Sequence, residues 1–385
     1  MAIIIVSGAL ANKPRNGGEA WVRLSWIEGF RKLGHDVYFI EQISEKACVD
    51  RAGVACSLED SINLEYFRQV TESFGLSGRS ILICNDGEKI IGATRPELLA
   101  LATGAALLVN ISGNLQWAPV IQRLRRKALV DIDPGFTQFW HDAGTSRIPE
   151  HDHYFTVALN LGRPECCIPT CGIDWKITLP PVVLEQWPVH AAPDPLRLTT
   201  IASWRGAFGP VEASGKRYGV KAHEFRKFVA LPSRVKQKLE IALSIHPGDQ
   251  RDSDLLRENG WQTVSPADVA ATPAGFRQYV QNSGGECSMA QGIYVDTNSG
   301  WFSDRTVRYL ASGKPVLVQE TGFSRCLPSG LGLVSFRTFD EAVAGATSIA
   351  ERYSEHCVAA RSIAERYFSS DVVLNRFIDD AGGLA

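Results

Sequence analysis

The chain opens with a pattern typical of alternating strands and helices. Residues 3–6 form an apolar run of the kind found in strands buried on both faces. A loop rich in Gly, Pro and Asn follows at 7–18. From Glu19 onward, apolar residues recur at helical spacing: Trp21, Leu24, Ile27, Phe30 and Leu33. Gly34 then predicts the end of the helix, and residues 36–41, "DVYFIE", predict a second strand. Two parallel strands joined by a helix are the repeating unit of a doubly wound sheet.

Further buried strands are predicted along both halves of the chain. They are "SILICND", "AALLVNIS" and "ALVDIDP" in the first half, and "LRLTTIASW" and "KLEIALSI" in the second. Polar or turn residues follow each strand of the first half, where the carboxyl ends of parallel strands place binding sites. The segment from Leu179 to Pro195 contains five prolines and predicts an inter-domain linker. Because 385 residues exceed what one hydrophobic core usually serves, we expect two α/β domains.

Composition and charge narrow the classes of partner. The formal net charge is -2 and no basic stripe is present, so neither nucleic acid nor an anionic membrane is expected as a partner. The opening apolar run is too short to span a bilayer. Nine cysteines without a secretion signal indicate a reducing cytosol. Cys166, Cys167 and Cys171 lack paired Cys-x-x-Cys spacing and a nearby His, which favours loop thiols over a metal site.

The stretch from Ser299 to Phe323 concentrates groups that bind anions. Ser303 is suited to cap a helix that begins near Asp304, and Gly313 is suited to end it. The start of such a helix offers free backbone N–H groups and the positive end of its dipole. Arg305 and Thr306 add a cation and a hydroxyl in the first turn. This pattern predicts a phosphate site, although a helix with a Ser cap and solvated charges shows the same sequence.

The same stretch resembles the donor-site element of GT-B glycosyltransferases. Its parts are "SGWFSD", "RTVRYLAS", "GKP", "VLVQ" and "ETGF". It departs from the family pattern at two positions. Gly300 stands where many members have a phosphate-contacting His or a Glu, and Arg308 stands where a ribose-binding Glu is common. Glu286, in "SGGECSMAQ", is a candidate to replace that Glu in binding the ribose.

Two other segments are similar to the same family. "NGGEAWVRLSWIEGFRKLGHDVYFIE" resembles its Gly-Gly loop, long helix and following strand, which implies that Gly17 and Gly18 approach the donor phosphates or the acceptor. Arg205, in "TTIASWRGAFG", and Lys221, in "VKAHEFRKF", occupy places where the family carries cations for the pyrophosphate. Such cations stabilise the charge that gathers on a leaving diphosphate. The alternative is that both are solvated surface cations.

The resemblance implies the GT-B architecture, with two Rossmann-like domains facing across a cleft. We expect an acceptor-side domain at residues 1–185 and a nucleotide-sugar domain at 186–367. In the last segment, 368–385, a helix over 371–380 is expected to cross back to the first domain.

The resemblance also implies an activity. It implies a bacterial, cytoplasmic, metal-independent Leloir enzyme that needs no cofactor. This enzyme moves a sugar from a UDP- or TDP-sugar to a small-molecule or glycan acceptor. A sugar-nucleotide 2-epimerase of the same shape and a non-catalytic sugar-nucleotide-binding protein stay open as alternatives. A nicotinamide dehydrogenase is disfavoured, because the first loop lacks Gly-x-Gly-x-x-Gly.

An inverting transferase also needs a base near the acceptor hydroxyl. Asp133, at the strand end in "DIDPGF", is the first candidate, followed by Asp131 and His141. An Asp before Pro-Gly is also a common turn former, and a retaining enzyme needs no such base. Three tryptophans could pack against an acceptor, with burial in the core as the alternative: Trp21, Trp26 and Trp140.

Overall fold

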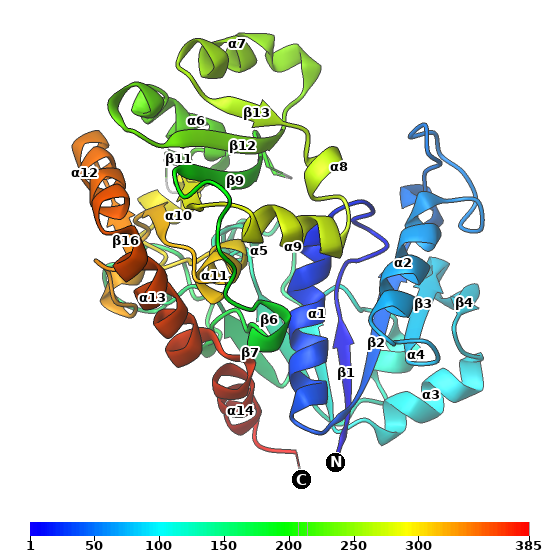
Figure 1. The fold of residues 1–385 in the computed structure, drawn as a ribbon. Coiled ribbons are helices and arrows are strands. Elements are labelled where there is room, and N and C mark those ends of the chain that lie inside the picture. Colours follow the sequence, from blue (N-terminus) through cyan, green and yellow to red (C-terminus); the bar gives the residue numbers. More distant parts are fainter. Residues whose placement is uncertain (207, 214, 385) are drawn as a thin grey trace.

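The protein is built on two largely parallel β-sheets, each covered by helices (Figure 1). The computed structural model describes residues 1–206, 208–213 and 215–384. The first sheet has the strand order β4-β3-β2-β1-β5-β6-β7-β8, and the second has the order β13-β12-β9-β14-β15-β16. Only β4 runs antiparallel to its neighbour in these two sheets. A separate hairpin, β10–β11, follows the first strand of the second sheet.

The bounds of the elements are as follows. The first sheet comprises β1 (Ile3–Ser7), β2 (Asp36–Ile43), β3 (Ser80–Cys84), β4 (Lys89–Ile91), β5 (Leu107–Ile111), β6 (Lys127–Asp131), β7 (His153–Thr156) and β8 (Trp175–Ile177). The second comprises β9 (Arg197–Ser203), β12 (Lys238–Ser244), β13 (Gln262–Val264), β14 (Gly285–Ser288), β15 (Val316–Gln319) and β16 (Leu333–Phe336), and the hairpin comprises β10 (Val211–Ala213) and β11 (Lys216–Tyr218).

The helices of the first half are α1 (Gly17–Lys32), α2 (Ile62–Ser73), α3 (Arg95–Gly104), α4 (Ala118–Ile121) and α5 (Phe136–Asp142). Those of the second half are α6 (Lys221–Lys227), α7 (Gln250–Glu258), α8 (Pro266–Val269), α9 (Pro273–Gln281), α10 (Gly292–Asp296), α11 (Asp304–Ala311), α12 (Phe339–Glu351), α13 (Tyr353–Ile363) and α14 (Ser370–Asp380). None of the helices in the described ranges is long and apolar enough to cross a lipid bilayer.

Both sheets have the strand order of a Rossmann-like fold, so the predicted fold class is confirmed. Each sheet is wound outward in both directions from its first strand, β1 or β9. The direction of winding reverses between β1 and β5 and again between β9 and β14. At such a point the loops after neighbouring strands diverge and leave a crevice at their carboxyl ends. The candidate site lies at the crevice between β9 and β14.

Helix α1 lies between the first sheet and two helices from the second half of the chain, α9 and α14 (Figure 1). It begins at Gly17, two residues before the predicted start, where the Asn16 side chain accepts a hydrogen bond from the Glu19 amide. Because it packs on several sides, Trp21 and Trp26 are buried core residues. The alternative prediction for these two tryptophans, burial in the core, is therefore confirmed, and neither can pack against an acceptor.

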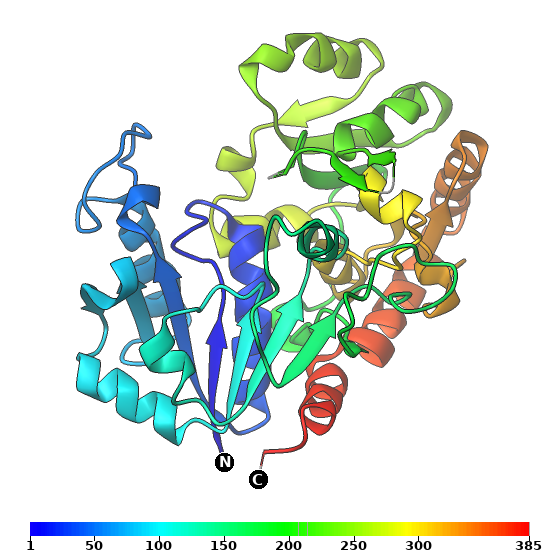
Figure 2. The ribbon, with the colours of Figure 1, turned by 180° about the vertical axis from the view of Figure 1, so that it is seen from behind.

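The proline-rich segment expected as a linker is itself packed into the protein. Trp187 is fully buried and its ring lies 4.9 Å from that of Trp21. The backbone of Val182 is hydrogen-bonded to Phe368 and Ser370, which fixes the start of α14. Helix α14 then packs on α1, as the resemblance implied, and brings the two termini to the same end of the molecule (Figures 1 and 2).

Candidate functional site

The predicted anion-binding helix is α11. Ser303 lies at its N-cap, but its side chain makes no capping hydrogen bond, so that detail of the prediction is wrong. The hydroxyl of Ser303 and the first-turn N–H groups are therefore not engaged with each other. Gly313, with a φ of +69°, ends the helix, and the Lys314 amide donates to the Tyr309 carbonyl at 2.9 Å. The start of α11 lies beside the ends of β14 and β15, where a small cavity opens.

Arg305 ties α11 to the crevice between β9 and β14. Its guanidinium donates to Glu286 Oε1 at 2.6 Å, to the Ile201 carbonyl at 2.9 Å and to Ser288 Oγ at 2.7 Å. These partners lie on β9 and β14, the two strands that flank the crevice. Glu286 is fully buried, and its Oε2 has no hydrogen-bond partner among the described residues. Three residues predicted for the donor site, Arg305, Glu286 and Thr306, thus lie close together.

Lys221 is the first residue of α6; it is nearly buried and lies near enough to Arg305 and Glu286 to be affected by their charges. Within the described ranges it forms neither a hydrogen bond nor an ion pair. Burial, together with the nearby charge of Arg305, lowers the pKa of Lys221 to about 7, while Glu286 opposes the shift. A buried cation without a partner is a group that an anionic ligand would stabilise.

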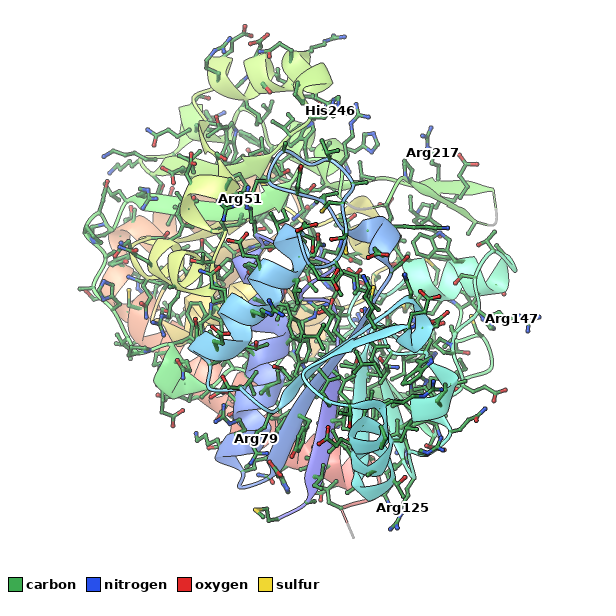
Figure 3. All side chains as sticks on the ribbon, turned by 90° about the vertical axis from the view of Figure 1, so that its right-hand side faces the viewer. Arg51, Arg79, Arg125, Arg147, Arg217 and His246 are labelled. Atoms are coloured by element: carbon green, nitrogen blue, oxygen red, sulfur yellow. The ribbon has the colours of Figure 1, made fainter. Side chains whose placement is uncertain are left out.

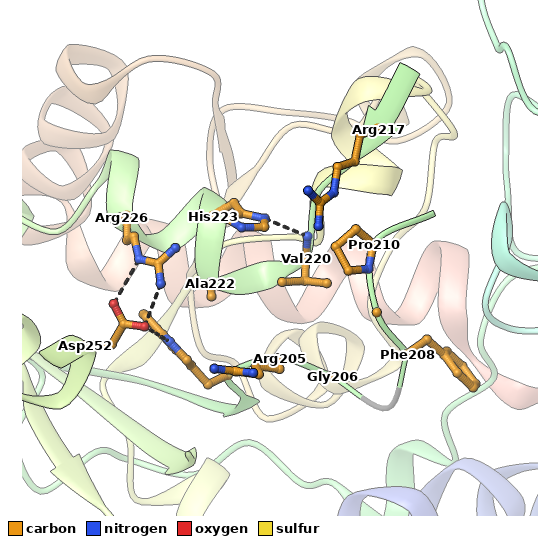
Figure 4. A pocket seen from close by; sticks show the side chains of 12 residues that line it. Arg205, Gly206, Phe208, Pro210, Arg217, Val220, Ala222, His223, Arg226 and Asp252 are labelled. Atoms are coloured by element: carbon orange, nitrogen blue, oxygen red, sulfur yellow. Dashed lines mark hydrogen bonds and ion pairs between the residues drawn. The ribbon is translucent and has the colours of Figure 1, made fainter. Parts of the chain in front are cut away.

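Arg205 lies in a neighbouring pocket rather than in this cluster (Figure 4). Its side chain is 70% exposed and pairs with Asp249, its Nε lying 2.8 Å from Oδ2. The pocket has a volume of about 390 Å³ and is lined by the following side chains and glycines: Trp204, Arg205, Gly206, Phe208, Gly209, Pro210, Arg217, Val220, Ala222, His223, Arg226 and Asp252. Val220 and Ala222 flank Lys221 in the chain. The two predicted cations therefore lie at adjoining places; Arg205 is paired, and Lys221 has no partner in the part of the chain that the structure describes.

The remaining predicted donor residues are engaged within the protein. A Cβ atom added to Gly17 would lie 2.2 Å from the Thr272 carbonyl oxygen, and one added to Gly18 would lie 2.9 Å from the Phe276 ring. The close backbone approach at Gly17 is thus one between α1 and the segment before α9. Asp304 forms an ion pair with Arg308 on the next turn of α11.

Asp133 faces the other half of the molecule from the end of β6. The Tyr294 hydroxyl, on α10, donates to its Oδ1 at 3.1 Å. Burial, reinforced by the nearby charges of Glu19 and Asp131, raises the pKa of Asp133 to about 7, whereas Tyr294 and Arg23 lower it. The structure therefore gives the first candidate base a position between the two sheets and a pKa suited to proton transfer near neutrality.

The two other candidate bases have structural roles. Asp131 is buried and accepts hydrogen bonds from the side chains of Thr137, Gln138 and Thr156. It also accepts one from the backbone amide of Asp133 at 3.3 Å, which fixes the turn. His141 Nδ1 accepts from the Ile148 amide at 3.1 Å.

Sequence reasoning missed Arg23, Glu19 and Tyr294. Arg23 is nearly buried on α1, pairs with Glu19, and leaves its Nε without a partner in the described part of the chain. A Cβ atom on Gly8 would lie 2.8 Å from that Nε, so the glycine leaves room for the arginine. The sequence did contain a signal for Arg23. It lies three residues after Ala20 on the helix, so it is an arginine on an otherwise apolar stripe.

A second, polar pocket of about 780 Å³ lies at the carboxyl ends of β2, β3 and β5. Most of its lining residues are amides and carboxylates, and the full lining is Gln42, Ile43, Ser44, Glu45, Lys46, Asn85, Asp86, Glu88, Asn114 and Gln116. Asn85 and Asp86 have φ values of +47° and +54°. Asn and Asp adopt this left-handed conformation more readily than other residues with a side chain, so the two residues form a tight turn after β3.

Among the described side chains, no group of three or more His, Cys, Asp or Glu could hold a metal ion. All nine cysteines are free thiols, including Cys166, Cys167 and Cys171.

No protein-family model and no curated protein matches the chain. Solved structures match its fold over nearly the full length. An α-glucosyltransferase in complex with UDP has a TM-score of 0.62 at 10% identity and covers 99% of both chains. HepE of Anabaena, in complex with UDP and glucose, has a TM-score of 0.59 at 11% identity, over 99% of this chain and 100% of that one. AviGT4, a glycosyltransferase involved in avilamycin A biosynthesis, has a TM-score of 0.54 at 12% identity, over 99% and 97%.

The α-glucosyltransferase has also been solved with UDP and DNA, at a TM-score of 0.60. At these identities the likeness establishes the GT-B fold of this chain.

Proposed function

We propose that the protein is a glycosyltransferase that moves a sugar from a nucleoside diphosphate donor, most readily a UDP- or TDP-sugar, to a glycan or small-molecule acceptor. The observation that carries this proposal is the nearly buried ammonium group of Lys221, which has no hydrogen-bond or ion-pair partner among the described residues and lies near Arg305, at the crevice between β9 and β14. Fold relatives solved with UDP support the choice of donor.

In this proposal the charge on the leaving diphosphate is stabilised by protein groups. Lys221, the N–H groups of α11 and the hydroxyls of Ser303 and Thr306 would bind its oxygens, and Arg205 would approach from the adjoining pocket. Groups held in place before the reaction stabilise developing charge more than they stabilise the ground state. They would do the work that a divalent metal does in other transferases, so no metal or cofactor is required in the scheme.

In this proposal Asp133 is the base that accepts the proton of the acceptor hydroxyl. As the acceptor oxygen bonds to the anomeric carbon, the bond from that carbon to the diphosphate oxygen breaks and the acceptor proton passes to the Asp133 carboxylate. This is an inverting scheme. A product with the anomeric configuration of the donor, read by NMR, would exclude it and leave Asp133 without this role.

The polar pocket on the first sheet favours a polyhydroxylated acceptor. The amides of Asn114 and Gln116 can donate to and accept from hydroxyl groups, and the Asp86 carboxylate accepts from them. Glu45, Asp86 and Glu88 outnumber Lys46 in this pocket and would repel a phosphate backbone. The arginines labelled in Figure 3 lie at separate places around the molecule. We therefore infer a glycan acceptor and no nucleic acid. The free thiols fit a reducing cytosol.

The proposal is tested first by ligand binding. Among UDP, TDP, GDP and ADP, the matching nucleotide raises the melting temperature, since it binds only the native state. Thr306→Val and Arg205→Ala should each weaken binding, by about 1.5–3 kcal/mol for the arginine, the scale of a charged hydrogen bond. Thr347→Val, on the exposed face of α12, is the matched control. Calorimetric affinities unchanged in both site variants would contradict the proposed donor site.

Transfer assays separate the rival functions. Incubation with donor alone would interconvert the sugar if the protein were a 2-epimerase, whereas a transferase needs the acceptor. A screen of glycans, small alcohols and duplex DNA should give product with the glycans. Nucleotide binding without product in any arm would favour a non-catalytic sensor.

A further inference from the structure

Tyr294 joins the two halves of the molecule at the candidate base. It lies on α10, in the second half of the chain, and its hydroxyl donates to Asp133 Oδ1, at the end of a strand of the first sheet. The two residues are 161 positions apart in the chain. Tyr294 is almost completely buried, so its ring has one packed position, and its hydrogen bond engages Asp133 Oδ1, whereas Oδ2 has no hydrogen-bond partner among the described residues.

The ring of Tyr294 is stacked on the segment that leads into α11. Its centroid lies 4.4 Å from that of Trp301, with 18° between the ring planes. Trp301 is two residues before Ser303, the N-cap of α11.

The Trp301 segment is held from both sides. Its backbone pairs with Ala158 of the first half of the chain, and its carbonyl accepts from the Thr321 hydroxyl at 2.6 Å. One continuous set of contacts therefore runs from the entry of α11, through two stacked rings, to the Asp133 carboxylate.

We infer that Tyr294 is a positioning residue that orients Asp133 and links its orientation to the entry of the donor helix. A donor bound at α11 would hold the Trp301 segment in place, and this in turn would hold the Tyr294 hydroxyl against Oδ1. The Asp133 carboxylate would thus be aligned for proton transfer when the donor-binding half of the site is in contact with the half that carries Asp133. The chemical meaning of this link rests on the proposed glycosyl transfer, but the link itself is a property of the fold.

The hydrogen bond has a defined effect on the charge of Asp133. The charged and titratable groups acting on it are Glu19 and Arg23 from α1, Asp131 from β6, and Tyr294 from α10. The pKa of Tyr294 is raised well above its ordinary value by burial and by Asp133, so the phenol stays protonated and donates. Without this donor, the carboxylates of Glu19 and Asp131 act on Asp133, and among the described groups named above Arg23 alone opposes them. Its pKa should then rise above 7.

The experiment compares Tyr294→Phe with Tyr218→Phe. Tyr218 also contacts the other half of the molecule, stacking on Phe139 at 5.1 Å, but its hydroxyl lies near Cys167 and not near Asp133. Tyr294→Phe should lower kcat about tenfold and leave the UDP dissociation constant within about twofold, as expected for one lost hydrogen bond that acts on chemistry alone. The acidic limb of its kcat–pH profile should also shift to higher pH, because this limb follows the pKa of Asp133. Tyr218→Phe should change neither.

Two further measurements isolate the link from a structural effect. If Tyr294 acts through Asp133, the two substitutions are not additive, and Tyr294→Phe changes the residual kcat of Asp133→Asn less than about twofold. A carboxyl NMR titration, assigned with Asp133→Asn, should show the pKa of Asp133 about one pH unit higher in Tyr294→Phe than in the parent.

The outcomes separate this inference from the proposed function. The NMR titration needs no activity, so it tests the link even if no transfer is found. Transfer activity with identical pH profiles and carboxyl titrations in Tyr294→Phe and Tyr218→Phe would overturn the inference and leave the transferase assignment standing. Full additivity with Asp133→Asn would also overturn it.

Discussion

At the scale of single residues, the site contains two groups whose pKa values burial moves in opposite directions. Burial disfavours the charged form of either group, so it lowers the pKa of Lys221 and raises that of Asp133, each to about 7. A lysine of this kind is mostly neutral above pH 7 and regains its charge when an anion binds. Binding and catalysis should therefore depend on pH within the neutral range.

The first prediction concerns Lys221. A nucleoside diphosphate binds the protonated lysine, so UDP affinity should fall as pH rises from 7 to 9, by at most about tenfold per pH unit for one coupled proton. In Lys221→Gln the affinity should be lower by about 1.5–3 kcal/mol at pH 6.5 and nearly independent of pH. Isothermal titration calorimetry across this range measures both effects.

The control for this prediction is Lys238→Gln. Lys238 is an exposed lysine that pairs with Asp194 where β12 begins, at the amino end of the parallel strands and thus away from the crevice at their carboxyl ends. This variant should keep the parent pH dependence. A parent affinity that is flat from pH 7 to 9 would show that Lys221 does not meet the diphosphate.

At the scale of elements, helix α1 shows how a predicted element can acquire an unpredicted role. Its apolar periodicity predicted one buried face, but the helix is buried on several sides because α9 and α14 cover what the first sheet leaves open. Its first residue, Gly17, packs against the backbone before α9, and the Gly17 amide donates to the Ala270 carbonyl at 2.8 Å.

Gly17→Ala tests this contact. The added methyl group would clash with the Thr272 carbonyl, so the free energy of unfolding should fall by about 1–3 kcal/mol, the usual scale of overpacking. UDP affinity should stay within about twofold. Urea unfolding and calorimetry measure the two quantities.

Gly104→Ala is the matched control. A Cβ atom at Gly104, in the last position of α3, would meet only Ile3 Cδ1 at 3.9 Å, and the substitution should be neutral or slightly stabilising. Unchanged stability with weakened UDP binding in Gly17→Ala would place Gly17 at the donor instead, as the resemblance implied.

At the scale of the whole molecule, the two sheets share one continuous apolar core. This core runs from β1 through α1 to α9, α11 and the C-terminal helix. Phe377 of α14 shows the connection, since its ring lies 4.9 Å from that of Trp26 and 4.1 Å from that of Phe155. The last helix thus closes the first half of the molecule after the chain has completed the second.

Phe377→Ala should therefore destabilise the whole protein. Removing a buried phenylalanine costs about 3–5 kcal/mol, and the loss should appear in a single calorimetric transition because the core is shared. Val372→Ala, on the exposed side of the same helix, should change the melting temperature little. Two separate transitions in Phe377→Ala, with only one shifted, would contradict a shared core.

The order of strands and helices was readable from the sequence alone. Buried strands and amphipathic helices carry their own hydrophobic periods, and glycine ends a helix through its own backbone freedom, as at Gly34 and Gly313. The residue types around α11 were also predictable, because a helix start attracts anions wherever it occurs.

Only the tertiary structure decided what those residues face. Among the described residues Lys221 lacks a partner while Arg205 has Asp249, and Tyr294 reaches Asp133 across 161 positions of the chain. Such contacts depend on how the two sheets and α14 pack together. No local period in the sequence encodes them, because burial and charge at one residue are set by side chains that are distant in the chain.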